Sequence, residues 1–190
     1  MTNATAFWGS SPSCPGTAGT GSQTCNGNGD GLVNLGGAAN QYAELFTFWQ
    51  QLANAGLIEG SYTGISASGS GFSATATNSP KSRLSSGYWI SFSWGTGAVF
   101  SGNAAVFDGS YAENFMEVGG LVAGSSPENP LLKPEEIWNI DKKLDDGKPA
   151  YGIVRVRYPT SCTTAADSST LSADYLLTSS ANCVPLFTMR

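Results

Sequence analysis

The sequence of 190 residues contains no histidine and only 12% charged residues, about half of the usual share. The commonest general base and a common zinc ligand are therefore missing, which argues against a histidine-based hydrolase or zinc enzyme. Only nine residues are Lys or Arg, and the net charge is −5. Because contacts to phosphate groups need cationic side chains, we expect no nucleic-acid partner.

Long apolar runs are also missing, so neither a secretory signal peptide nor a membrane span is recognisable. The chain begins directly with Met1-Thr-Asn-Ala-Thr. Glycine is plentiful at 24 residues, and Ser, Thr and Asn are common. A surface of hydroxyls and amides suits an extracellular or periplasmic protein, so we expect that Met1 is not the natural start or that an upstream segment has been removed.

The four cysteines, Cys14, Cys25, Cys162 and Cys183, lack the short spacing of a zinc site. Each stands in a polar, loop-like stretch, which favours two disulfides and an oxidising compartment over free thiols. Four cysteines allow three pairings. The simplest joins Cys14 to Cys25 and Cys162 to Cys183, and each bond would then stabilise the fold by about 3 kcal/mol.

The segment Asn40–Gly64 begins with an amphipathic helix. Its apolar side chains recur at three- and four-residue steps and share one face: Tyr42, Leu45, Phe46, Trp49, Leu52 and Ala53. Asn40 can cap the start. Gly56 can end the helix in the left-handed conformation, with Leu57 packing back on Leu52.

Oxygen-bearing side chains alternate in Cys25-Asn-Gly-Asn-Gly-Asp-Gly, just before this helix. Asn26, Asn28 and Asp30 occupy the first, third and fifth positions of a calcium loop, and Leu32 the seventh, which supplies a backbone carbonyl. The closing glutamate is absent, and Glu44 on the helix is the candidate replacement. The sequence therefore predicts a weak calcium site, with a glycine-rich turn held by Asx hydrogen bonds as the alternative.

Alternating and aromatic-rich segments predict short strands, with a second helix between them. The strands are expected at Gly87–Trp94, Ala98–Phe107, Asn114–Val118, Gly152–Tyr158 and Val184–Thr188, and the helix at about Pro134–Leu144. Long Gly/Ser-rich loops join them, including 66–80. We predict a single α+β domain over residues 1–190, in which an antiparallel sheet packs on a helix and the loop Cys162–Cys183 protects a sheet edge.

Paired carboxylates at Glu135/Glu136 and Asp145/Asp146 do not indicate catalysis, because adjacent residues do not share a helix face and the glutamates match the helix dipole. Trp89 and Tyr88 are candidates for stacking on a sugar, although strands favour aromatic residues for packing alone. Phe7 and Trp8 are expected to anchor the N-terminal loop in an apolar site.

Five stretches together resemble a known family: NATAFWG, CNGNGDG, ELFTFWQQLANAGLIEGSYTG, Pro80-Lys81-Ser82 and IDKKLDDGKP. They resemble the globular head of type IV pilin-like proteins and type II secretion pseudopilins. The resemblance spans about residues 3–187, and its most specific parts are FWQQLANAGLIEGSYTG and IDKKLDDGKP. The family's cleavage site and the glutamate near its mature N-terminus are not in this sequence.

The resemblance implies a head made of an antiparallel sheet on a helix, often finished by a disulfide-bounded loop. It also implies a leader and a hydrophobic helix ahead of Met1, which would anchor the full-length form in the inner membrane before assembly. The partners would be other pilin or pseudopilin subunits, and some members bind calcium in the head.

We therefore expect a non-enzymatic minor pilin or pseudopilin subunit of a type IV pilus or a type II secretion pseudopilus. The alternative is a secreted or surface-displayed module that binds a glycan or a protein through aromatic and loop residues. A secreted hydrolase would need a carboxylate dyad that the sequence does not reveal.

Overall fold

The computed structural model describes residues 1–12, 14, 18–33, 43–67, 72–84, 86–94, 106–107, 113–180 and 183–189. Its elements are α1 (Ala4–Trp8), α2 (Ala43–Asn54), β1 (Tyr88–Trp94), β2 (Glu113–Gly119), α3 (Pro134–Leu144), β3 (Val154–Arg157), α4 (Pro159–Cys162) and β4 (Val184–Met189). The expected Asn40 cap, Tyr42 and most of the expected strand Ala98–Phe107 lie outside the described residues.

The four strands form one antiparallel sheet in the order β1-β2-β4-β3. This confirms an α+β architecture built on an antiparallel sheet. The closing strand β4 lies inside the sheet between β2 and β3, and the loop Cys162–Cys183 follows the edge strand β3. That this loop protects the edge stays a prediction. Pro80–Ser82 covers the start of the β1 edge, where Trp89 N donates to the Pro80 carbonyl at 2.9 Å and Ser82 N to the Gly87 carbonyl at 2.7 Å.

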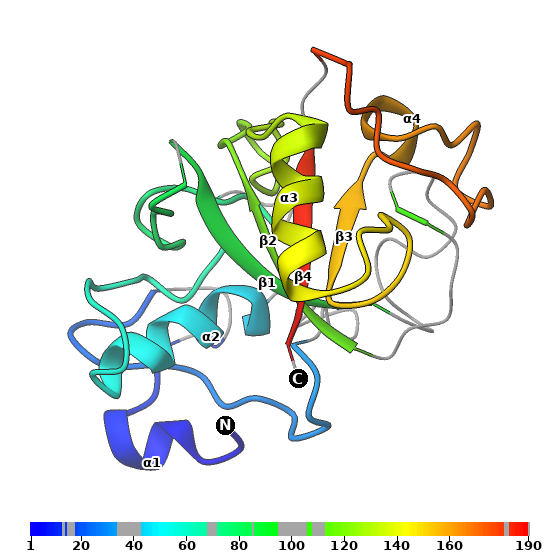
Figure 1. Ribbon diagram of the computed structural model, residues 1–190. Helices are drawn as coiled ribbons and strands as arrows, with labels where there is room; N and C mark the ends of the chain where they lie inside the picture. The colour runs from blue at the N-terminus through cyan, green and yellow to red at the C-terminus, as the bar shows by residue number, and fades with distance from the viewer. Residues whose placement is uncertain are drawn as a thin grey trace.

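The two longer helices pack against opposite faces of the sheet. One core cluster joins Leu45 and Phe46 of α2 to Ile90, Phe92 and Leu186. Because side chains alternate along a strand and Leu186 lies opposite Arg155, Val154 and Val156 point to the other face. Those two valines pack with Ile137 of α3. Helix α3 lies in front of the sheet in Figure 1.

Local signals place both helices. Gly56 has φ +70°, and Leu57 N donates to the Leu52 carbonyl at 3.0 Å, as in a Schellman stop. Leu57 itself is 71% exposed although it lines one hollow together with Leu52, so any packing between the two leaves most of its side chain in solvent. The predicted bounds Pro134–Leu144 of α3 are confirmed.

Three local features were not apparent from the sequence. The segment 2–25 contains the short helix α1, and Phe7 is 71% exposed rather than anchored. The described part of the loop 66–80 has buried members, because Asn78 donates to the carbonyls of Ile65 and Ser73, both at 2.9 Å. Leu144 at the end of α3 is 54% exposed because it follows the last buried turn.

Both disulfides follow the simplest pairing, Cys14–Cys25 and Cys162–Cys183. Cys162 and Cys183 are 0% and 1% exposed and belong to the core on the α3 side. The bonds indicate an oxidising environment, extracellular or periplasmic. Among the described residues, no helix is both long and apolar enough to span a membrane.

Candidate functional site

The predicted calcium loop folds around Asn28 and Asp30. Asp30 N donates to Asn28 Oδ1 at 3.0 Å, Leu32 N donates to Asp30 Oδ1 at 2.8 Å, and Asn28 Nδ2 donates to Asp30 Oδ2 at 2.9 Å. Gly29 and Gly31 have φ of +83° and +82°, a conformation that glycine adopts without steric cost. The loop is thus a pair of successive Asx turns.

Glu44 reaches this loop from the first turn of α2. Its Oε1 accepts a hydrogen bond from Asn28 N at 2.9 Å. A Cβ atom at Gly27 would lie 2.7 Å from the same oxygen, so the glycine makes room for the carboxylate. The two carboxylates of the proposed set, Asp30 and Glu44, are therefore both hydrogen-bonded to Asn28.

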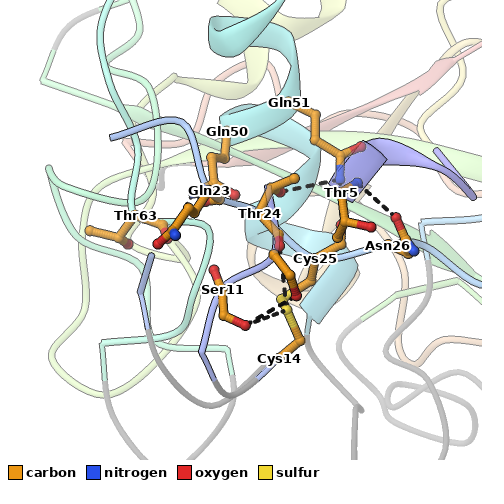
Figure 2. Close-up of a disulfide and its surroundings, with 11 residues drawn as sticks. Thr5, Ser11, Cys14, Gln23, Thr24, Cys25, Asn26, Gln50, Gln51 and Thr63 are labelled. Atoms are coloured by element: carbon orange, nitrogen blue, oxygen red, sulfur yellow. Dashed lines mark hydrogen bonds between the residues drawn. A yellow bond between two sulfur atoms is a disulfide. The ribbon is translucent and has the colours of Figure 1, made fainter. Parts of the chain in front are cut away.

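Asn26 points elsewhere, because its Oδ1 accepts a hydrogen bond from Thr5 N of α1 at 2.9 Å (Figure 2). The side chains of Asn28, Asp30 and Glu44 supply oxygen atoms only, which is the donor chemistry that calcium prefers. Each of them also accepts an N–H within the loop, so an ion would share these oxygens. The donor set fits a weak cation site better than a tight one.

Two glutamines of α2 fix the N-terminal segment beside this loop (Figure 2). Gln50 Nε2 donates to the Gln23 and Thr63 carbonyls at 3.0 and 3.2 Å, and Gln51 Nε2 donates to the Cys25 carbonyl at 2.8 Å. Both glutamines are under a tenth exposed. The helical pattern gives no sign of their burial, because their carbonyl partners are distant in sequence.

A second acidic group, Asp141, Asp145 and Asp146, has ligand atoms within 4.8 Å of one another. Buried Asp141 accepts hydrogen bonds from the Tyr175 hydroxyl at 2.8 Å and from Gly147 N at 3.1 Å. Burial raises the pKa of Asp141 to about 6, against the effect of those two hydrogen bonds.

The other two carboxylates of this group accept hydrogen bonds from backbone N–H groups of the segment that follows α3. Asp145 Oδ2 accepts from Ile153 N, and Asp146 Oδ1 accepts from Lys148 N at 2.7 Å. The group therefore holds the segment after α3 and ties it to the loop between Cys162 and Cys183. Of the other expected pair, Glu136 closes the start of α3 by accepting from Lys133 N at 2.7 Å.

A buried ionic cluster lies at the α2-side face, beneath the loop that follows β2. Arg157 Nη1 donates to Glu117 Oε1 and Oε2 at 3.0 and 2.9 Å, and Arg157 Nη2 lies 2.5 Å from Glu128 Oε2. Burial raises the pKa of Glu117 against the pull of the Arg157 guanidinium. Burial also acts to raise the pKa of Glu128, but hydrogen bonds from Ser125 and Tyr158 and the nearby Arg157 bring it below its usual range.

An open hollow of about 680 Å³ lies where β1 begins and β2 ends. Its side chains come from four segments: Ser86, Tyr88, Leu121, Asn129, Leu131 and Ser161. Of the two aromatic residues expected to stack on a sugar, only Tyr88 lines the hollow. Trp89 packs against Phe187 with ring centroids 5.9 Å apart.

The loop after β2 shapes this hollow through a close approach at Gly119. A Cβ atom there would lie 1.7 Å from the Pro127 carbonyl oxygen, so only glycine lets the loop fold back. Gly120 and Asn129 then exchange backbone hydrogen bonds of 2.8 and 3.1 Å. Sequence reasoning missed the hollow because its walls are distant along the chain.

Comparisons with known proteins add no relative. No family model matches the chain, and no curated protein or solved structure matches it either.

Proposed function

We infer that this chain is the globular head of a pilin-like structural subunit, a minor pilin or pseudopilin, with no enzymatic role. The observation that carries the proposal is the disulfide-closed segment Cys162–Cys183. It follows β3 and leads directly into the central strand β4, and both cysteines are buried in the core. A head of this kind suits repeated display outside the cytoplasm, because its C-terminal segment is covalently held.

The covered sheet edges support the same proposal. Pro80–Ser82 pairs with the start of β1, and Val106 bridges to Arg157 on β3. An exposed strand edge is a template for uncontrolled pairing with other chains. A subunit stored at high local concentration before assembly benefits from having its edges blocked. In this proposal, neighbouring subunits contact the head and a hydrophobic helix ahead of it holds it in the inner membrane.

The test is to isolate the native protein from cell envelopes and to read its N-terminus by mass spectrometry. The proposal expects a processed, N-methylated apolar segment of about 20–25 residues ahead of Met1, long enough to span a membrane. Cells without the enzyme that removes such leaders serve as the control and should keep the unprocessed form. A conventional cleaved secretory signal with a soluble start near Met1 would contradict the proposal and favour a secreted binding module.

A second candidate function is weak calcium binding by Asn28, Asp30 and Glu44 with the Leu32 carbonyl, without Asn26, whose Oδ1 accepts from Thr5 N. The observation that favours calcium binding is the contact between Glu44 and the loop, in which Glu44 Oε1 lies 2.9 Å from Asn28 N. An ion there would tie α2 to the N-terminal segment. The melting experiment in the Discussion tests it.

A further inference from the structure

The hollow at the start of β1 offers hydrogen-bonding groups that the protein itself leaves unused. Tyr88 is half-buried, and its hydroxyl makes no hydrogen bond to any residue that the structure describes. Asn129 Nδ2 donates to the Leu121 carbonyl at 3.0 Å, which leaves Asn129 Oδ1 as an acceptor. Ser161 Oγ donates to the Tyr158 carbonyl at 2.9 Å, and its lone pairs remain available.

Apolar surface lies between these polar groups. The Tyr88 ring shares the hollow with Leu121 and Leu131, while Ser86 stands exposed at its rim. A ligand that fills this space must present apolar C–H groups to the ring and the leucines. It must also present hydroxyls or amides to Tyr88, Asn129 and Ser161.

Charge excludes two ligand classes. None of the described lining residues is charged, so a phosphate or sulfate group would find no Lys or Arg. A metal ion would find no carboxylate. The net charge of −5 further disfavours an anionic ligand through long-range repulsion.

Backbone pairing excludes a peptide added as an extra strand. At this end of the sheet, Gly120 and Asn129 satisfy each other, and Trp89 N donates to the Pro80 carbonyl. Tyr88 is paired on both sides, with Gly119 in β2 and Lys81 beyond the edge. Strand addition needs a free row of backbone groups, and this end of β1 has its row already paired.

We propose that this hollow binds a neutral carbohydrate, with the Tyr88 ring stacking on one pyranose face and Asn129 and Ser161 accepting from its hydroxyls. Sugars combine a C–H face with a ring of hydroxyl groups, which is the complement of the surface described above. The inference goes beyond a structural role, because the head would also recognise a glycan.

The experiment uses the full 190-residue chain on an array of neutral and acidic oligosaccharides, followed by titration calorimetry with the best neutral glycan. Wild type should retain neutral glycans selectively. Tyr88→Ala should weaken binding at least tenfold, and Tyr88→Phe about threefold to tenfold through loss of one hydrogen bond. Ser161→Ala, at an exposed position that accepts from the sugar in this proposal, should weaken binding a few-fold with little change in melting temperature. Tyr151→Ala, an exposed tyrosine outside the hollow, is the matched control and should bind like wild type.

Three results would overturn the proposal. The first is that no neutral glycan is retained by wild type, and the second is that only acidic glycans are retained. The third is binding that survives Tyr88→Ala in a protein with native circular dichroism. If Tyr88→Ala fails to fold, Tyr88→Phe and Ser161→Ala replace it as the test, because unchanged affinity in both variants contradicts the proposal. None of these results bears on filament assembly, so the two proposals fail separately.

Discussion

Arg157 on β3 donates from Nη1 to both carboxylate oxygens of Glu117 on β2, at 3.0 and 2.9 Å, across the intervening strand β4. The two side chains are 6% and 0% exposed. Glu128 joins them from the loop after β2, 2.5 Å from Arg157 Nη2. One cation therefore pairs with two carboxylates that come from different parts of the chain.

Arg157→Leu should destabilise the fold by about 3–5 kcal/mol, because it leaves two carboxylates without their cation. Glu117→Gln should cost less, since Arg157 keeps Glu128. The matched control is Arg155→Leu, two residues earlier on the same strand, which is buried like Arg157 but pairs with Glu113, whose side chain is 41% exposed. Because it leaves a carboxylate that water can still reach, it should cost about 1 kcal/mol. Urea denaturation measures all three, and an equal loss for Arg155 and Arg157 would contradict the role of the burial of Glu117.

Asp141 should make stability depend on pH between about 4 and 6. Burial raises its pKa from 3.8 to about 6, so in this window the folded protein binds more protons at Asp141 than the unfolded chain does. Stability from this group is thus present at low pH and is lost as pH rises through the folded pKa. Asp141→Asn should remove that loss.

The measurement is the melting temperature of wild type and Asp141→Asn at several pH values. The difference between them, wild type minus variant, should fall as pH rises from 4 to 6. Asp167→Asn is the control: hydrogen bonds from Ser169 and Thr170 lower the pKa of Asp167, so the contribution of Asp167 rises slightly with pH and is complete above about pH 5. A constant difference for Asp141→Asn across the window would show that its carboxyl is not perturbed.

The two disulfides should contribute unequally. Their sequence separations are 11 and 21, and the chain-entropy model assigns about 3 kcal/mol to each. Cys162 and Cys183 are also core residues, whereas Cys14 is exposed. Replacing Cys162 and Cys183 together by alanine should therefore cost more, by about 1–2 kcal/mol, than replacing Cys14 and Cys25. Guanidinium denaturation compares the two double variants, and equal losses would argue against a packing role.

Calcium should raise the melting temperature if Asp30 and Glu44 hold it. A dissociation constant of about 1 mM and about 10 mM calcium give about 1.4 kcal/mol by linkage, or roughly 4 °C for a chain of this size. Asp30→Ala and Glu44→Gln should abolish the rise. Asp146→Asn, in the other acidic group, should keep it. If calcium does not raise the melting temperature of wild type, or if only Asp146→Asn removes the rise, the Asn26–Leu32 loop is not the calcium site.

Sequence patterns correctly predicted those structural features that are determined by residues close together in the chain. The stop of α2 at Gly56, the start of α3 at Pro134 and the alternation of β3 depend on residues within one or two turns of each other, so their spacing is visible in the chain. The simplest disulfide pairing also held, because each bond closes a short loop. Composition alone indicated a chain poor in charge and suited to an oxidising compartment.

Tertiary structure decided everything that depends on distant partners. The position of β4 between β2 and β3, the meeting of Arg157 with Glu117, and the burial of Asp141 beneath Tyr175 follow from how the sheet pairs and which faces it buries. A helical or alternating pattern specifies one apolar face but not what covers it. For the same reason Phe7 is exposed although it is aromatic, and Tyr88 rather than Trp89 lines the hollow.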